Sequence, residues 1–209
     1  MPSGLNVVID LSHHNQTVDF AQVKGAGILG VIHKATQGVA FVDPTYADRR
    51  ALASRAGLLW GAYHFGTASD GVQQAQAFLK AVGDPTNLLL VLDFENNMTG
   101  PSMTLEEARA FVTHVQQATN RYPAFYCGQY FKELMGTGTD PILAQCPLWL
   151  AQYGPTAVVP PNWPTWTLWQ YTDGAQGDGP YEVAGVGRVD RDVYNGSSAA
   201  DLQKLWTGS

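Results

Sequence analysis

The stretch Leu88-Leu89-Leu90-Val91-Leu92-Asp93-Phe94-Glu95 is an apolar run that ends in two carboxylates. Its five consecutive aliphatic residues predict a strand buried on both faces, as in a parallel sheet covered by helices. Because side chains alternate along a strand, Asp93 and Glu95 are expected on one face and Phe94 on the other. Two buried acids on one face push their pKa values apart, which suits the acid and the stabilising partner of glycoside cleavage. The pair therefore favours a functional site over a strand that simply runs out into a polar loop.

Composition limits the class of protein. The chain has 209 residues and a formal charge of −6 at pH 7, a length that suits one domain spanning residues 1–209. The negative charge argues against nucleic acid or an anionic membrane as the main partner, but it leaves a neutral polysaccharide open. No stretch reaches the roughly 20 apolar residues of a transmembrane helix. The N-terminal residues lack the basic and apolar segments of a signal peptide, so the export route stays open.

Short apolar strands alternate with helical stretches along most of the chain. Strands are predicted at 7–9, 29–33, 58–65, 88–95, 124–126, 148–151, 167–171 and 189–190, and helices near 20–26, 43–57, 71–82, 104–119 and 131–135. Asp43 is expected to cap the second helix, with Pro44 in its first turn. The last third is expected to lack helices. Repeated βα units imply a parallel sheet, so we predict an α/β fold, an irregular TIM-like β/α barrel of eight strands with fewer helices in the C-terminal third.

Polar and aromatic residues recur where the predicted strands end. In barrels of this type, functional side chains gather at the carboxyl ends of the strands. Acids supply proton transfer and charge stabilisation, and aromatic rings offer faces on which sugars stack. The pattern predicts a carbohydrate-active enzyme. The residues at these ends are Asp10, His33, Lys34, Tyr63, His64, Asp93, Glu95, Tyr126, Gln152, Tyr153, Gln170, Tyr171, Asp190 and Asp192.

Histidines and cysteines offer two further interpretations. Several histidines fall near strand ends, but the chain has no H-E-x-x-H motif, so neither a metal site nor a cofactor is expected. Cys127 and Cys146 are able to form a disulfide, although two buried free thiols are the favoured interpretation.

The order and spacing of several motifs match a known family. They are Asp10-Leu11-Ser12-His13-His14-Asn15, Val31-Ile32-His33-Lys34, Gly61-Ala62-Tyr63-His64-Phe65, Asp93-Phe94-Glu95, Trp149-Leu150-Ala151-Gln152-Tyr153, Trp169-Gln170-Tyr171 and Val189-Asp190-Arg191-Asp192. Over essentially its whole length the chain resembles the glycoside hydrolase family 25 lysozymes, the Chalaropsis-type muramidases. The resemblance implies hydrolysis of the β-1,4 bond between N-acetylmuramic acid and N-acetylglucosamine in bacterial cell-wall peptidoglycan.

The resemblance also assigns roles by position. Glu95 matches the proton donor, and Asp93 matches the partner that orients or stabilises the 2-acetamido group of the substrate. Asp10 and Asp190 match the remaining acids of the cleft. The predicted substrate contacts are Lys34, Tyr63, Tyr126, Trp149, Gln170 and Asp192.

Three positions depart from the family pattern. Gln37 stands where the family often has glutamate, and Phe41 lies near a position that often carries an aromatic hydroxyl. Asp192 stands where asparagine is common, so the functional C-terminal acid is either Asp190 or Asp192. The Asp93-Phe94-Glu95 motif itself is intact.

Alternatives of mechanism and class remain. Strand spacing alone does not separate retaining from inverting carboxylate pairs, and we favour substrate assistance by the acetamide with net retention. A chitinase-like enzyme would carry acids at the positions of Leu88 and Val91. A non-catalytic peptidoglycan-binding module has no need of four converging acids.

We expect a monomer acting outside the cell or in the cell wall, as a phage endolysin, a secretion effector or a trimmed secreted enzyme.

Overall fold

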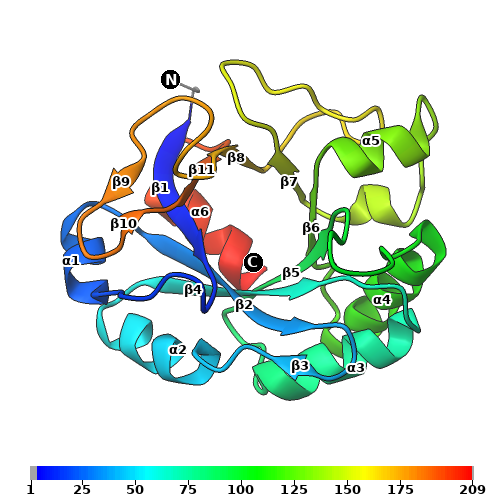
Figure 1. The fold of residues 1–209 in the computed structure, drawn as a ribbon, viewed down its shortest axis with the longest axis horizontal. Coiled ribbons are helices and arrows are strands. Elements are labelled where there is room, and N and C mark those ends of the chain that lie inside the picture. The colour runs from blue at the N-terminus through cyan, green and yellow to red at the C-terminus, as the bar shows by residue number, and fades with distance from the viewer. Residues whose placement is uncertain (1–3, 209) are drawn as a thin grey trace.

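Eight strands close into a barrel in the computed structural model, which describes residues 4–208. Strand β1 pairs with both β2 and β11 and so completes the ring (Figure 1). The α/β barrel predicted from the sequence is confirmed. In order around the ring, the strands are β1 (Leu5–Leu11), β2 (Gly30–Gln37), β4 (Leu59–Phe65), β5 (Leu89–Phe94), β6 (Ala124–Cys127), β7 (Leu148–Ala151), β8 (Leu168–Thr172) and β11 (Asp190–Tyr194).

Helices lie outside the ring after each of the early strands. They are α1 (Phe20–Gly25), α2 (Tyr46–Arg55), α3 (Gly71–Val82), α4 (Leu105–Thr119) and α5 (Gln129–Met135), and a 3-10 turn, η1 (Leu143–Gln145), precedes β7. Helix α4 begins with the capping box that the sequence predicts, in which Thr104 and Glu107 satisfy each other's backbone N–H groups. Among residues 4–208, we find no helix whose length and apolarity would carry it through a bilayer.

The strands present two different faces. Outward side chains such as Leu90, Leu92 and Phe94 of β5 pack with the outer helices in the larger core cluster. Inward side chains such as Leu89 and Val91 fill the interior of the barrel in a second cluster. Asp93 therefore continues the inward row, because side chains on a strand alternate with period two. This confirms that Phe94 faces away from Asp93.

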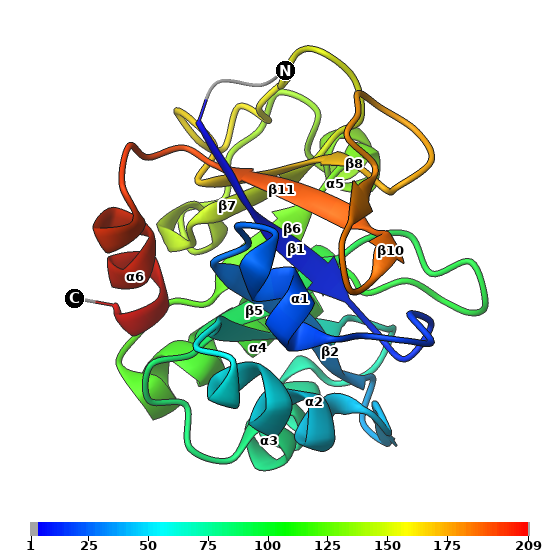
Figure 2. The same ribbon diagram turned by 90° about the vertical axis from the view of Figure 1, so that its left-hand side faces the viewer.

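The last strand runs opposite to the direction we predicted. Strand β11 is antiparallel to both neighbours, β1 and β8 (Figure 2). Parallel neighbours require a crossover, usually a helix, whereas the segment between β8 and β11 contains only the small hairpin β9 (Glu182–Val183) and β10 (Gly187–Arg188). The start of β11 consequently lies at the edge where the other strands end, and Asp190 pairs in register with Asp10.

A helix that we did not expect closes the other end of the barrel. The expectation that the last third lacks helices is wrong, because α6 (Ala199–Thr207) follows β11. Leu202 and Trp206 of this helix are fully buried in the interior cluster, and α6 is seen through the ring of strands in Figure 1. A Cβ at Gly30 would lie 3.0 Å from the Trp206 ring, so glycine is needed there for α6 to dock.

The expected role of Asp43 as a helix cap is also wrong. Helix α2 begins at Tyr46 with Thr45 as its N-cap, and Pro44 stands before the helix. The Asp43 carboxylate instead accepts hydrogen bonds from the Thr45 backbone N–H and hydroxyl at 2.9 and 2.8 Å and from the His13 backbone at 2.9 Å. Asp43 therefore fixes the loop after β1 and the antiparallel turn that β2 forms with β3 (Phe41–Val42).

Candidate active site

A cavity of about 170 Å³ opens at the carboxyl edge of the parallel strands. It brings together eight of the ten residues predicted for the site, and Tyr153 joins them as a residue missing from that set. Lys34 and Asp192 are not part of its lining. The lining residues are Asp10, Tyr63, Asp93, Glu95, Tyr126, Trp149, Tyr153, Gln170 and Asp190.

The alternation of strand side chains explains this convergence. The side chain two residues beyond the interior cluster on each strand faces the same way as the cluster and reaches the cavity. On β5, Asp93 follows Val91 in this way, and on β8, Gln170 follows Leu168. Tyr153 comes from the loop after β7, where no strand period applies. Tyr153 is among the aromatic residues that the sequence places at strand ends, although it was not among the predicted substrate contacts.

Gln170 connects two tyrosines to an acid. Its Nε2 donates to Asp10 Oδ2 at 2.8 Å, while its Oε1 accepts from the Tyr126 and Tyr153 hydroxyls at 2.8 and 3.2 Å. The orientation of the amide is thus fixed by three hydrogen bonds. Gln170 therefore holds Asp10 in place at the base of the cavity and orients two hydroxyls that face it.

Asp10 and Asp190 pair in register across β1 and β11, and both carboxyls line the cavity. Burial raises the pKa of Asp10 well above its ordinary value, and the negative charges of Asp190 and Asp192 raise it further. Burial also raises the pKa of Asp190, to about 6. Each carboxyl therefore keeps its proton to a higher pH than a free carboxyl does, which reduces the negative charge at the base of the cavity.

Asp93 and Glu95 form a second pair of acids. Burial, followed by the charge of Glu95, raises the pKa of Asp93 well above its ordinary value, and Lys34 opposes the shift. Burial likewise raises the pKa of Glu95, again opposed by Lys34 and assisted by Asp190. Glu95 is half-buried just beyond the end of β5. A protonated carboxyl at the mouth of the cavity is suited to proton donation.

One oxygen of Asp93 lacks a hydrogen-bond partner. Asp93 is only 6 % exposed, and its Oδ1 has no partner among the described residues 4–208. A buried acceptor without a donor is unfavourable by about 1–3 kcal/mol. Because Asp93 lines the cavity, a donor on a bound substrate is able to satisfy this oxygen.

Lys34 lies behind the acids rather than in the cavity lining. Its Nζ donates to Gln37 Oε1 at 2.6 Å and stands 4.8 Å from the centre of the Phe65 ring. Gln37 is neutral, so it leaves the charge of Lys34 available to Asp93 and Glu95. Burial lowers the pKa of Lys34, whereas these acids raise it.

Asp192 lies beneath the cavity and is fully buried. Its Oδ1 accepts a hydrogen bond from Trp149 Nε1 at 2.7 Å, and its Oδ2 is unpartnered within residues 4–208. Burial raises the pKa of Asp192 well above its ordinary value, and Asp190 adds to the shift. Asp190, not Asp192, is therefore the C-terminal acid that faces the cavity.

Asp192→Asn is expected to stabilise the fold, because asparagine keeps the acceptor for Trp149 without the cost of a buried charge. A carboxyl whose pKa is raised by folding stabilises the protein fully at low pH, and that contribution disappears as pH rises through the raised pKa. The variant should therefore gain on the order of 1–3 kcal/mol in unfolding free energy at pH 7 and less at pH 4.5.

Urea unfolding of the wild type and Asp192→Asn at these two pH values measures the effect. Asp48→Asn, a change at an exposed position of α2, is the matched control. A variant equally or less stable than the wild type at pH 7 would contradict a charge cost at Asp192.

Two of the five histidines and both cysteines are buried away from the cavity. His33 and His64 are fully buried against helices, and burial lowers the pKa of each to about 4. Cys127 and Cys146 are free and buried, and burial raises the pKa of both thiols. Within residues 4–208, no three His, Cys, Asp or Glu side chains are grouped so that they could hold a metal ion.

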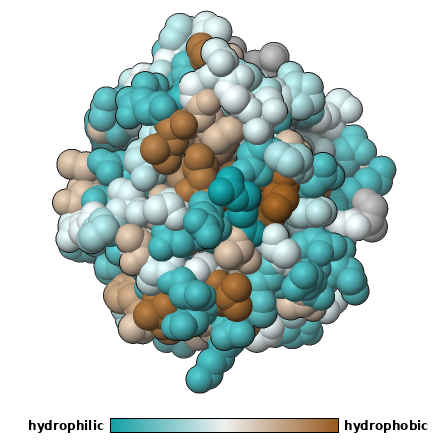
Figure 3. Space-filling view, turned by 90° about the vertical axis from the view of Figure 1, so that its right-hand side faces the viewer, coloured by the Kyte–Doolittle hydropathy of each residue, from teal (hydrophilic) through white to brown (hydrophobic). Residues whose placement is uncertain are grey.

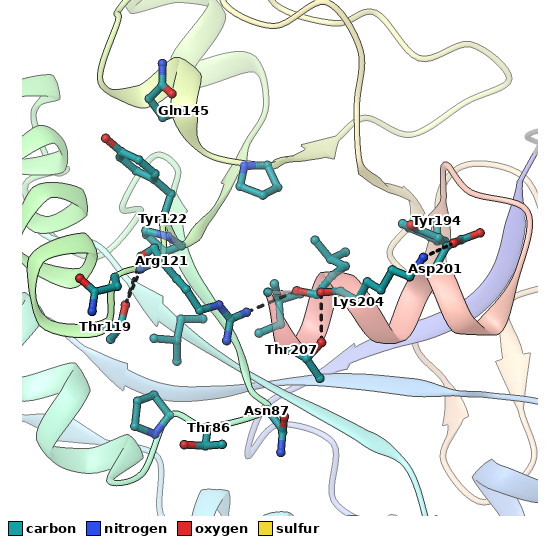
Figure 4. Close-up of a pocket in the computed structure, with 18 residues that line it drawn as sticks. Thr86, Asn87, Thr119, Arg121, Tyr122, Gln145, Tyr194, Asp201, Lys204 and Thr207 are labelled. Carbon is teal, nitrogen blue, oxygen red and sulfur yellow. Dashed lines mark hydrogen bonds and ion pairs between the residues drawn. The ribbon is translucent and has the colours of Figure 1, made fainter.

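A larger cavity, of about 880 Å³, lies at the opposite edge of the barrel (Figure 4). The residues before β5, β6 and β7 line it together with α6. Arg121 points across it and donates to the carbonyl oxygens of Leu205 and Trp206 at 3.5 and 2.8 Å, so it caps the end of α6. Asp201 is the single carboxylate among the lining residues. One acid does not provide an acid and a stabilising partner, so this cavity is not the catalytic site.

Comparisons with known proteins agree with this geometry. The family model "Glycosyl hydrolases family 25" matches residues 9–179. Lysozyme M1 of Streptomyces globisporus is 33% identical over 206 residues, which cover 91% of this chain and 68% of the relative. The N,O-diacetylmuramidase of a Chalaropsis species is 28% identical over 95% of this chain and 98% of the relative. The crystal structure of the bacterial lysozyme from Streptomyces coelicolor superposes with a TM-score of 0.86 at 33% identity and covers 100% of this chain and 99% of that one.

The chain belongs to glycosyl hydrolase family 25. The resemblance drawn from the sequence is therefore confirmed, as is the class of activity it implies, a glycoside hydrolase of the lysozyme and muramidase type. The roles of individual residues remain predictions.

Proposed function

We propose that the protein is a lysozyme that cleaves the β-1,4 bond between N-acetylmuramic acid and N-acetylglucosamine in bacterial peptidoglycan, with Glu95 as the general acid. The observation that carries the proposal is the placement of two different acids at one cavity. Glu95 is half-buried at the mouth, whereas Asp93 is buried and carries an oxygen without a donor. The lysozyme and muramidase relatives support the substrate class.

Glu95 is assigned the proton transfer. Its raised pKa keeps a fraction of the carboxyl protonated, so it is able to protonate the departing glycosidic oxygen. Once it has lost that proton, the same carboxylate is able to take a proton from the incoming water. Lys34 limits the rise of the Glu95 pKa, which keeps both protonation states accessible.

We assign to Asp93 the binding and orientation of the 2-acetamido group of the substrate. Its unpartnered Oδ1 is suited to accept a hydrogen bond from the acetamido N–H. This bond would orient the acetamide carbonyl toward the anomeric carbon. The carbonyl oxygen then forms a bond to that carbon as the glycosidic bond breaks, and the electron pair leaves with the protonated oxygen. Water reopens the resulting ring, which gives net retention.

The other residues of the cavity hold the sugar. Tyr63, Tyr126 and Trp149 present aromatic surfaces, and Gln170 orients the Tyr126 hydroxyl toward the cavity. Asp10 and Asp190 line the same cavity as Asp93 and Glu95, and their carboxyls would stabilise positive charge at the anomeric centre.

Release of new reducing ends from purified peptidoglycan tests the proposal. The wild-type protein should release them in proportion to time and enzyme concentration. Binding to the wall without new reducing ends would instead identify a peptidoglycan-binding module and overturn the proposal.

Activity is expected to decline as pH rises through the pKa of Glu95, because only the protonated carboxyl donates. That pKa is raised from its ordinary value of 4.5, so the alkaline limb of kcat/KM should lie above pH 4.5. Lys34→Met should move this limb to higher pH, since it removes the cation that lowers the Glu95 pKa. An alkaline limb of kcat/KM below pH 4.5 in the wild type, or a shift of this limb to lower pH in Lys34→Met, would contradict the assignment of Glu95 as the general acid.

The same reasoning extends to the place of action. Peptidoglycan is the substrate, so we propose that the protein acts in the cell wall or outside the cell. A single catalytic domain over residues 1–209, a monomeric state and the lack of nucleic-acid or membrane partners belong to this proposal. They rest on the length of the chain and its net charge of −6.

A further inference from the structure

A second cavity, of about 840 Å³, leads outward from Glu95. It shares Glu95, Tyr126 and Tyr153 with the active-site cavity, so the two form one continuous groove. We call this extension the α5 groove. Its floor includes residues at the start of α5, and its rim carries the exposed side chains of Met98 and Val158. Figure 3 views the side of the molecule on which α4 and α5 lie and shows apolar patches within a mainly polar surface.

Lys132 is the single cation that lines the α5 groove. It stands on α5, is partly buried, and its Nζ donates to Gln152 Oε1 at 2.6 Å. Gln152 is held in turn, because its Nε2 donates to the carbonyl oxygen of Thr156 at 3.1 Å. Among residues 4–208, Lys132 takes part in no ion pair, and Gln152 is the one hydrogen-bond partner of its Nζ.

This environment is unusual for a lysine with a structural role. An ammonium group has three N–H donors, and a partly buried charge is favourable only where a counter-charge or water compensates it. Burial accordingly lowers the pKa of Lys132 from its ordinary value. The two remaining donors of Lys132 are available in a groove that begins at the proposed general acid.

The two cavities differ in the charged residues that line them. Four acids and no cation line the active-site cavity, namely Asp10, Asp93, Glu95 and Asp190, whereas the α5 groove adds the cation Lys132 to the shared Glu95. A muramyl unit carries a carboxylate, either on its lactyl ether or on the stem peptide attached there. The acids would repel that carboxylate, and Lys132 would attract it.

We propose that Lys132 binds a carboxylate of the muramyl side chain and so makes the α5 groove the part of the site that selects peptidoglycan over neutral glycans. The inference rests on the proposed function. It assigns substrate discrimination to a residue that takes no part in the chemistry. Gln152 holds the Lys132 side chain in position through its amide oxygen, and both residues line the groove.

Steady-state kinetics of Lys132→Met, Lys132→Arg and the wild type test this assignment. Four glycan substrates are compared. They are strands that keep their stem peptides, strands freed of peptide that carry the lactyl carboxylate, and each of these two after its carboxylates are coupled to methylamine as neutral amides. Lys80→Met, which removes an equal charge from an exposed position of α3, is the matched control.

Lys132→Met is expected to lower kcat/KM on a carboxylate-bearing strand about tenfold, mainly through KM, as befits loss of one charge-assisted hydrogen bond. Lys132→Arg should restore most of the loss, and Lys80→Met should have no effect. On the methylamide strands, wild type and Lys132→Met should be equal. A loss confined to peptide-bearing strands identifies the stem peptide as the source of the carboxylate, and a loss on peptide-free strands identifies the lactyl group.

Two results would overturn the inference. One is an equal loss on neutral and carboxylate-bearing strands, which would mean that Lys132 only supports the local structure through Gln152. The other is no loss on any strand. A wild-type protein that cleaves none of the strands would instead overturn the proposed function, so the two failures are distinguishable.

Discussion

Glu95→Gln is expected to lower kcat on purified peptidoglycan by about 10²–10⁴-fold, the range attributable to general acid catalysis. Glutamine has the size of glutamate and fills the same half-buried position beyond β5, but it has no proton to donate at neutral pH. The rate of reducing-end release and the circular dichroism spectrum of the variant should be measured together. We expect loss of cleavage with an unchanged fold.

A matched control separates the role of Glu95 from a general effect of lost charge. Glu106→Gln makes the same chemical change at an exposed position in the first turn of α4. This control should keep nearly full activity. A Glu95→Gln variant that cleaves at a near normal rate would show that another group donates the proton.

Asp93→Asn is expected to lower kcat by about 10²–10³-fold, as for other losses of one preorganised electrostatic contact. The amide is able to present a donor where the carboxylate presents an acceptor, so the acetamido N–H would lose its partner. The initial rate of reducing-end release from purified peptidoglycan by Asp93→Asn and by the wild type measures this loss.

Intact-protein mass spectrometry of the quenched wild-type reaction distinguishes two roles for Asp93. Substrate assistance predicts that no sugar is attached to the protein, and Asp48→Asn provides a kinetic control at an exposed aspartate. A glycosyl ester trapped on Asp93 would show that this carboxylate is itself the nucleophile.

Most of the site could be predicted because it follows from strand periodicity. Asp93 continues the inward row of β5, and Gln170 does the same on β8, so a strand prediction alone places both at one edge. Trp149, Tyr126 and Tyr63 follow by the same rule. Tyr153 lies in a loop, where no period indicates its direction, and its place in the cavity depends on the bond to Gln170.

Two of the wrong predictions, the direction of β11 and the role of Asp43, depend on contacts between distant segments. The direction of β11 is set by its pairing with β1 and β8, which no local pattern encodes. Helix α6 does carry a local signal, since Ser198 caps it and accepts from the Asp201 backbone N–H at 3.1 Å. Asp43 has a typical capping sequence, but its carboxylate is engaged by His13 and Thr45 from two sides.

The identity of the sugar at the new reducing end tests the central claim most directly. Purified peptidoglycan digested by the wild type should be reduced with borohydride, hydrolysed and analysed for amino sugar alcohols, with Glu95→Gln as the blank. We predict muramitol as the new product and none in the blank. Glucosaminitol in its place would identify a glucosaminidase or a chitinase-like enzyme and contradict the assignment.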